Sequence, residues 1–185
     1  MRSIIAALLM TMILAGSASA LEVAGVNLEP SVTVNGHLLK LNGYGLRKKL
    51  FIKVYAGSLY SAQRLTTTVA ALQDGGDKLI RMNFLHSKVE KERIIEAFKE
   101  GFANNAPELA GSTEAKKFLS LFSADFRRGD VVDLTLGADG AVSASHNGRQ
   151  LGSVPSARLG RGVLAIYLGD KPADEALKKG MLGKE

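Results

Sequence analysis

Three Asn-Gly or Asp-Gly dipeptides, each between stretches of alternating apolar and polar residues, constrain the fold of this chain more than any other feature. They are Asn35-Gly36, Asp139-Gly140 and Asn147-Gly148. Such pairs accept the positive φ angles of the short turns that join antiparallel strands. The first dipeptide therefore predicts a hairpin, and the last two predict a three-stranded antiparallel meander over residues 130–154.

Further strands and helices are expected around these turns. The strands are at residues 50–60 and 78–85, and the helices are at 66–72, 87–104, 113–122, 156–168 and 172–181. The second of these helices has the clearest start, because Ser87 followed by Glu90 matches a capping box, in which each side chain satisfies a backbone N–H of the first turn. Strands flanking a block of helices, with no linker, repeat or low-complexity tract between them, predict one α+β domain.

The strand at residues 50–60 has one apolar face and one mixed face. Alternation assigns Ile52, Val54, Ala56 and Ser58 to the first, and Phe51, Lys53, Tyr55 and Leu59 to the second. The run that leads into it, Arg47-Lys48-Lys49, adds more charge. A charged and phenolic face on a strand that otherwise belongs to a core is a candidate binding site.

Residues 1–20 have the pattern of a cleaved secretory signal peptide. A basic Arg2 precedes the apolar run from Ile4 to Ala15, and Ala18-Ser19-Ala20 matches the small-residue cleavage pattern. The alternative, a retained membrane anchor, is disfavoured because this run falls short of the roughly 20 apolar residues that cross a bilayer. We expect a periplasmic or secreted protein whose single domain spans residues 21–185.

Composition limits how this domain is stabilised and what it binds. The chain has no cysteine, so an apolar core rather than disulfides must stabilise the mature domain. With Arg2 removed from the 24 basic residues, against 18 acidic ones, the mature net charge is +5. The charges are scattered, which argues against nucleic acid and allows, without requiring, contact with an anionic ligand or a membrane surface.

Common catalytic patterns are missing from the sequence. His37, His86 and His146 lie far apart without cysteine partners, so we expect no metal site. No Gly-x-Ser-x-Gly elbow offers a serine nucleophile. The Gly43-Tyr44-Gly45 segment precedes a strand rather than a helix, which argues against a phosphate loop. No cofactor is expected, and catalytic residues stay unassigned.

Three segments of the chain carry a recognisable pattern. They are GYGLRKKLFIKVYAGSLY (43–60), FRRGDVVDLTLGADGAVSASHNGRQLGSV (126–154) and LAIYLGDKPADEALKKGMLG (164–183). Together they resemble the chalcone isomerase-like family, in its bacterial exported branch. The resemblance covers nearly all of the mature chain and implies an open-faced β-sandwich, in which a large antiparallel sheet carries a helical layer on one face and a ligand cleft lies between them.

The resemblance also implies a ligand site at Arg47, Tyr55 and Lys88. In the characterised branches an arginine just before the long strand meets the anionic oxygen of the ligand, and a guanidinium fork suits that role. Tyr55 stands where fatty-acid-binding relatives carry tyrosine and plant isomerases carry threonine, and Lys88 where the isomerases place a lysine. Each also has a structural explanation: an arginine paired with an acid, a tyrosine that fills the core, and a solvated lysine at a helix start.

Relatives in this superfamily divide by function. Plant enzymes close a chalcone ring by intramolecular addition, similar plastid proteins bind fatty acids without converting them, and bacterial members have no settled role. The tyrosine at position 55 favours non-catalytic binding of a fatty acid or similar amphipathic carboxylate. We expect the protein to be a monomer. The alternatives are an isomerase of the intramolecular lyase type, and an interaction module whose cleft is a remnant.

Overall fold

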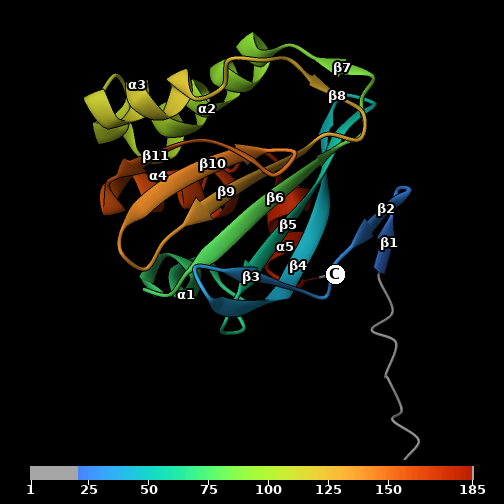
Figure 1. The fold of residues 1–185 in the computed structure, drawn as a ribbon, viewed down its shortest axis with the longest axis horizontal. Helices are drawn as coiled ribbons and strands as arrows, with labels where there is room; N and C mark the ends of the chain where they lie inside the picture. The colour runs from blue at the N-terminus through green and yellow to red at the C-terminus, as the bar shows by residue number, and fades with distance from the viewer. Residues whose placement is uncertain (1–20, 185) are drawn as a thin grey trace, which may run out of the picture.

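The structure is a computed structural model, and it describes residues 21–184. Its centre is a seven-stranded antiparallel sheet with the strand order β11-β10-β9-β6-β5-β4-β3 (Figure 1). These strands are β3 (Ser31–Val34), β4 (His37–Lys49), β5 (Ile52–Ser61), β6 (Lys78–Phe84), β9 (Val131–Leu136), β10 (Ala141–His146) and β11 (Arg149–Pro155). The predicted signal peptide lies outside the described residues.

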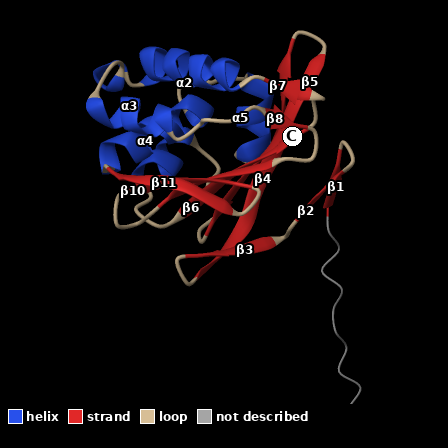
Figure 2. Ribbon diagram, turned by 45° about the horizontal axis from the view of Figure 1, so that its top comes forward, coloured by secondary structure: helices blue, strands red, loops and turns tan. Residues whose placement is uncertain are grey.

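Two small two-stranded sheets complete the β-structure. One pairs β1 (Leu21–Val23) with β2 (Val26–Leu28), and the other pairs β7 (Lys88–Val89) with β8 (Phe126–Arg127). The helices are α1 (Thr68–Gln73), α2 (Lys91–Asn105), α3 (Thr113–Ser120), α4 (Ala157–Leu168) and α5 (Glu175–Met181), with one 3₁₀ turn at Pro107–Leu109. The helices gather on one face of the large sheet (Figure 2), so the predicted α+β fold with a helical layer on one face is confirmed.

The turn dipeptides lie where the sequence predicts them. Asn35 and Gly36 have φ angles of 51° and 80° between β3 and β4, and Asn147 and Gly148 have 51° and 77° between β10 and β11. The loop between β9 and β10 is longer, and there Gly140 has a φ of 83°. Local turn chemistry therefore fixes these hairpins, because few residue types tolerate such angles.

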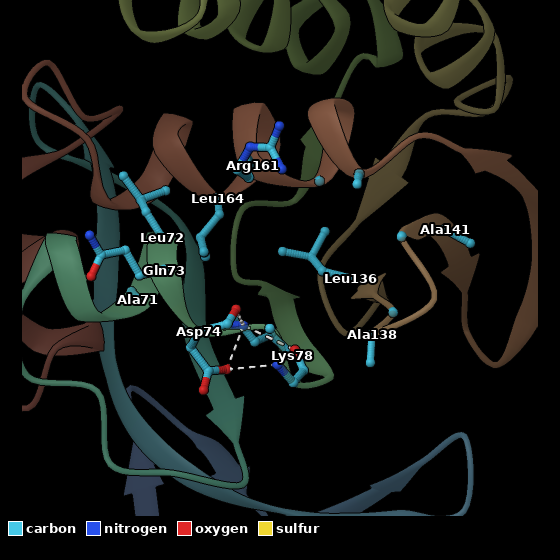
Figure 3. A pocket seen from close by; sticks show the side chains of 16 residues that line it. Ala71, Leu72, Gln73, Asp74, Lys78, Leu136, Ala138, Ala141, Arg161 and Leu164 are labelled. Carbon is cyan, nitrogen blue, oxygen red and sulfur yellow. Dashed lines mark hydrogen bonds and ion pairs between the residues drawn. The ribbon is translucent and has the colours of Figure 1, made fainter.

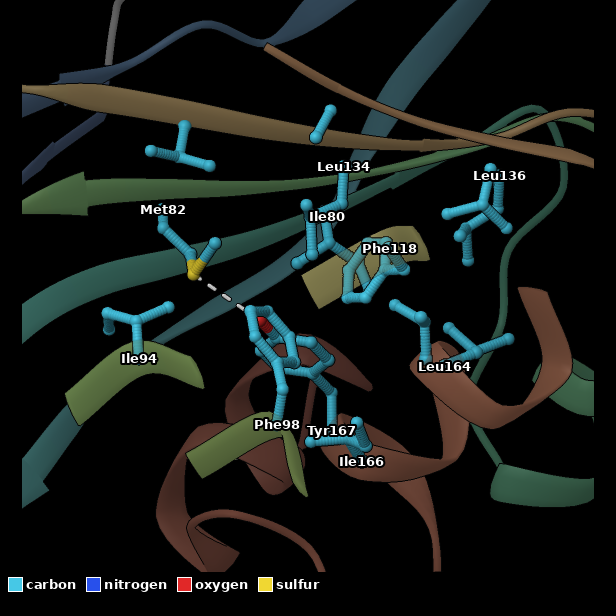
Figure 4. Close-up of a cluster of buried hydrophobic side chains, with 14 of the residues drawn as sticks. Ile80, Met82, Ile94, Phe98, Phe118, Leu134, Leu136, Leu164, Ile166 and Tyr167 are labelled. Carbon is cyan, nitrogen blue, oxygen red and sulfur yellow. Dashed lines mark hydrogen bonds between the residues drawn. The ribbon is translucent and has the colours of Figure 1, made fainter. Parts of the chain in front are cut away.

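The core lies between the sheet and the helices. Aromatic rings from α2 and α3 pack edge to face in this layer, and Phe126 of β8 stacks on Phe84 of β6. The aliphatic side chains of β6, β9 and α4 lie around the rings of Phe98 and Phe118 (Figure 4). A smaller cluster of Val34, Leu39, Tyr60 and Leu79 covers part of the opposite face. The helical face thus holds most of the buried apolar surface.

Helix α5 lies directly on strand β4 because glycine faces glycine there. A Cβ atom at Gly43 would overlap the carbonyl oxygen of Gly180, and one at Gly45 would come within 2.9 Å of the Leu177 Cα. The Gly43-Tyr44-Gly45 segment, which superficially resembles a phosphate loop, therefore serves close backbone packing.

The predicted capping box at Ser87 and Glu90 is wrong. Lys88 and Val89 form strand β7 opposite β8, so α2 begins only at Lys91, and the Glu90 side chain makes no capping bond. The Asp125 carboxylate instead accepts the backbone N–H of Lys91 at 3.1 Å. Pairing with a strand distant in sequence overrides the local capping signal, and a carboxylate from that distant segment supplies the cap.

The last helix also differs from its prediction, because α5 begins at Glu175 and not at Pro172. Asp174 is its N-cap, and its Oδ1 accepts the Leu177 N–H at 3.0 Å. Gly180 lies inside the helix, where its missing side chain permits the contact with β4.

Candidate ligand-binding site

An open cavity of about 640 Å³ lies between the β4–β5 end of the sheet and helix α2. Its walls also include β6, β7 and α4. The lining residues are Arg47, Lys49, Leu50, Ile52, Val54, Tyr55, Met82, His86, Lys88, Val89, Glu90, Arg93, Ile94, Glu96, Ala97, Phe98, Glu100, Ile166, Tyr167 and Ala173. This volume lies within the range of about 300–1,000 Å³ that is usual for small-molecule sites. All three residues predicted for the site, Arg47, Tyr55 and Lys88, line this one cavity.

The inner part of the cavity is apolar. Met82, Ile94, Phe98 and Tyr167 line this part, and Figure 4 shows the Tyr167 hydroxyl beside the Met82 sulfur. These side chains are buried. An elongated hydrocarbon group would lose contact with water on entering this part, which is the main source of affinity for such a ligand.

A bulge in the β4–β5 hairpin brings Arg47 beside Tyr55. Lys48 pairs with Lys53, but the register then shifts and Arg47 pairs with Tyr55. Residues directly opposite in an antiparallel pair point to the same face. The bulge also breaks the alternation of side chains along β5, so Val54 and Tyr55 both line the cavity. The prediction that they belong to opposite faces is therefore wrong at this point.

Arg47 is mostly buried, with 24 % of its side chain exposed. Its Nη1 donates a hydrogen bond to the Lys48 carbonyl at 3.0 Å and lies 3.6 Å from the Asp174 carboxylate. That carboxylate also accepts the Lys48 N–H at 3.1 Å and caps α5. Its charge is thus shared among several donors, and the loose pair with Arg47 neutralises the guanidinium only in part.

Two buried phenols lie next to Arg47. Burial raises the pKa of Tyr55 to about 12, against the opposing effects of the Arg47 charge and of the Tyr167 hydroxyl. Burial also raises the pKa of Tyr167 well above its ordinary value, and its hydroxyl lies 3.3 Å from the Met82 sulfur. Both phenols therefore stay protonated near neutral pH. Because the Tyr167 hydroxyl donates its hydrogen bond to the Met82 sulfur, Tyr55 is the candidate donor to a ligand.

Tyr167 is a cavity residue that the sequence reasoning missed. The segment that contains it carries the family resemblance, but no spacing rule connects position 167 with position 55. Only the folded chain brings Tyr167 of α4 against Met82 of β6 and its hydroxyl beside that of Tyr55 in β5.

Lys88 lies at the rim rather than at a helix start. Its side chain is exposed, and its Nζ lies 3.1 Å from the Asp125 carboxylate and 3.9 Å from that of Glu90. An exposed ion pair of this kind holds a side chain only weakly. Lys88 is therefore a weaker candidate ligand than Arg47.

The positive and negative charges of the residues that line the cavity are nearly equal in number. The basic side chains are Arg47, Lys49, Lys88 and Arg93, and the acidic ones are Glu90, Glu96 and Glu100. Glu96 lies 3.4 Å from Arg93. Because the cavity has little net field of its own, recognition of an anion depends on particular donors, above all Arg47 and Tyr55.

A second, smaller cavity of about 200 Å³ lies beneath α1 and α4 (Figure 3). The buried ammonium of Lys78 is fully engaged there, with Asp74 at 2.7 Å and with the carbonyl oxygens of Asp74 and Gly76. These bonds close the loop before β6, so the cavity offers a structural lysine and not a free ligand group.

Within residues 21–184, no group of three potential metal-ligating side chains comes together. In the same part of the chain, every helix is too short or too polar to cross a bilayer.

A cavity with an apolar interior and a few convergent polar groups, held between a sheet and a helical layer, is typical of small-molecule-binding α+β domains. The model of the chalcone isomerase-like family matches residues 20–183. The chain belongs to the chalcone isomerase-like family, as the resemblance of its three segments implies.

One comparison of sequence and one of structure each find a fatty-acid-binding protein of Arabidopsis thaliana. Fatty-acid-binding protein 1 is 27 % identical over 178 residues, which cover 80 % of this chain and 64 % of the relative. The chain thus spans somewhat less than two thirds of that protein. The crystal structure of an Arabidopsis thaliana fatty-acid-binding protein has a TM-score of 0.68 and 23 % identity, and covers 89 % of this chain and 96 % of that one. The structural likeness establishes the shared fold.

Proposed function

We propose that the protein binds a fatty acid or similar amphipathic carboxylate in the cavity beneath α2, without converting it. The observation that carries this proposal is the pairing of Arg47 with Tyr55 beside an apolar interior. A carboxylate can accept hydrogen bonds from the guanidinium and from the neutral phenol, while the hydrocarbon chain lies against Met82, Ile94 and Phe98. The name that both the sequence match and the structure match carry, fatty-acid-binding protein, supports this choice of ligand class.

The Arg47 guanidinium has enough N–H groups to bind such a ligand. Its Nη1 donates to the Lys48 carbonyl, and among the described residues its other nitrogens donate no hydrogen bond. A planar guanidinium has five N–H donors, so a ligand carboxylate can be bound through two of them while the existing bond stays in place.

Titration with saturated fatty acids of twelve to eighteen carbons tests this proposal, together with native mass spectrometry of the protein purified from its own compartment. Each buried methylene contributes up to about 0.8 kcal/mol, or roughly fourfold in affinity, until the cavity is full. We expect affinity to rise with chain length and then level off. The absence of binding in both measurements would remove the proposed ligand class.

Non-catalytic binding is tested against the alternative of an intramolecular lyase. A lyase would use Arg47 to stabilise a developing enolate, with Tyr55 or Lys88 to order water or donate a proton. Incubation with chalcones should give no rate above that of buffer for either the natural protein or Arg47→Ala. An accelerated reaction that the substitution abolishes would make the protein an enzyme.

We place this activity in the periplasm or outside the cell, after removal of residues 1–20. The intact mass of the protein from a periplasmic or secreted fraction tests this placement. We expect a chain that begins at Leu21, and a full-length chain confined to the cytoplasm would contradict it.

A further inference from the structure

The tip of the β4–β5 hairpin exposes large apolar side chains to solvent. Phe51 is 100 % exposed and Leu50 87 %, and Ile52 beside them is half exposed. The other two-residue turns of the large sheet carry Asn-Gly instead. Large apolar side chains gain nothing for the fold when water surrounds them, so this tip requires another explanation.

The backbone of the tip is also unfavourable for its sequence. Leu50 has a φ of 56°, in the left-handed region that branched and bulky residues rarely adopt. Asn or Gly at this position would form the turn with less strain. An observed backbone outlier that local folding does not need is a reason to look for a functional role.

Positive charge surrounds the base of the tip. Lys48 and Lys53 lie directly opposite each other across the hairpin, where two like charges repel. Lys49 follows at the end of β4, and the segment from Gly43 to Tyr60 contains no acidic residue. An apolar tip with a cationic base is complementary to a bilayer surface with anionic headgroups, in which apolar side chains enter the interface and lysines remain at the headgroups.

We propose that this tip docks the protein on anionic phospholipid bilayers. Phe51 and Leu50 enter the interface, and Lys48, Lys49 and Lys53 contact the headgroups. Lys49, Leu50 and Ile52 also line the ligand cavity, so docking brings the cavity mouth to the membrane, where a fatty acid could pass between bilayer and protein. This transfer role rests on the proposed function, but the docking itself does not.

A single tryptophan provides the test, because the chain contains none. Phe51→Trp places one fluorophore at the tip, and Leu38→Trp places one at an exposed position at the other end of β4. With vesicles of phosphatidylglycerol and phosphatidylethanolamine, we expect a blue shift and quenching by brominated lipid for Trp at position 51 only. Neutral phosphatidylcholine vesicles should bind about tenfold more weakly or worse, and added salt should release the protein.

Sedimentation with the same vesicles measures whether substitutions at the tip weaken vesicle binding. Phe51→Ser and the double variant Lys48→Gln/Lys53→Gln should each reduce vesicle binding about tenfold or more, whereas the matched control Leu38→Ser should not. Unchanged emission of the Trp at position 51 on anionic vesicles would overturn the proposal. A blue shift without vesicles, accompanied by a dimer in size-exclusion chromatography, would overturn it in favour of a second copy of the chain.

The docking proposal and the ligand-binding proposal can be tested independently of each other. Phe51 lies outside the cavity lining, so Phe51→Ser should bind fatty acids in vesicle-free solution as the natural protein does. Loss of vesicle binding with retained titration supports docking as a distinct property. Vesicle binding by a protein that binds no fatty acid would support docking and remove the transfer role.

Discussion

Replacing Arg47 separates ligand binding from support of the fold. Lys keeps the charge but loses the planar fork, and Met removes the charge while roughly keeping the stem. We expect fatty-acid affinity to fall in the order Arg, Lys, Met. A lost charge-assisted hydrogen bond of about 1.5–3 kcal/mol corresponds to roughly 10- to 150-fold for Met. Isothermal titration and thermal melting of each variant provide the measurement.

The melting temperature of the ligand-free Arg47 variants should hardly change. The contact with Asp174 is loose, at 3.6 Å, and such pairs near the surface contribute about 0–1 kcal/mol. Arg158→Met is the matched control, because it removes an arginine bonded to Glu114 outside the cavity and should leave ligand affinity unchanged. The opposite pattern, a melting point lowered by several degrees with affinity intact, would assign Arg47 to the fold.

The raised pKa of Tyr55 makes a prediction about pH. Since burial raises this pKa to about 12, the phenol stays a neutral donor throughout the range from pH 7 to pH 10, while a fatty acid is already ionised there. Affinity should therefore be independent of phenol ionisation in this range. Tyr55→Phe should weaken binding by about 0.5–1.5 kcal/mol at both ends of it. If the natural protein, but not Tyr55→Phe, loses affinity above pH 8, the phenol ionises too easily for this assignment.

The contact between helix α5 and strand β4 leaves no room for an added methyl group. A Cβ at Gly43 meets backbone atoms of Gly180, Met181 and Gly183, and backbone atoms cannot move aside as a side chain can. Gly43→Ala should lower the free energy of unfolding by about 1–3 kcal/mol or more. Gly75→Ala is the control, since nothing lies within 4 Å of its added methyl group. Equal urea midpoints for the two variants would show that α5 does not depend on this contact.

Sequence reasoning succeeded for elements whose geometry is encoded locally. Asn35-Gly36 and Asn147-Gly148 specify their turns through their own backbone preferences, so neighbouring residues suffice to find them. The prediction of where α2 begins failed, because the capping residue, Asp125, comes from a segment 34 residues away. The pairing of Arg47 with Tyr55 depends on a bulge, and the position of Tyr167 depends on how α4 crosses the sheet. Only the assembled fold contains that information.

On the scale of the whole molecule, Asp77 connects distant parts of the sheet. Its carboxylate accepts hydrogen bonds from Asn35 at 3.0 Å and from the Ala138 N–H at 2.9 Å, and lies 2.5 Å from the His37 ring. These groups belong to the β3–β4 turn and to the loop after β9. One buried carboxylate thus ties the edge hairpin to the meander, on the side of the molecule away from the ligand cavity.

This arrangement predicts how stability depends on acid. Burial alone would raise the pKa of Asp77, but hydrogen bonds from His37, the Ala138 N–H and Asn35 outweigh it and hold the pKa below its ordinary value. The folded state therefore favours the charged carboxylate. Its contribution is complete above the unfolded pKa, near 3.9, and is lost as the pH falls through the lower folded value. Asp77→Asn should accordingly be less stable than the natural protein by about 1–3 kcal/mol at pH 7.

The decisive quantity is the difference in unfolding free energy between the natural protein and Asp77→Asn, measured by urea denaturation from pH 7 down to pH 3. We expect this difference to stay constant down to about pH 4 and to shrink below it, because protonation removes from the natural protein the charge that the substitution has already removed. Asp170→Asn is the control, since it changes an exposed aspartate. A difference that stays constant to pH 3 would mean that Asp77 stabilises the fold through its shape and not through its charge.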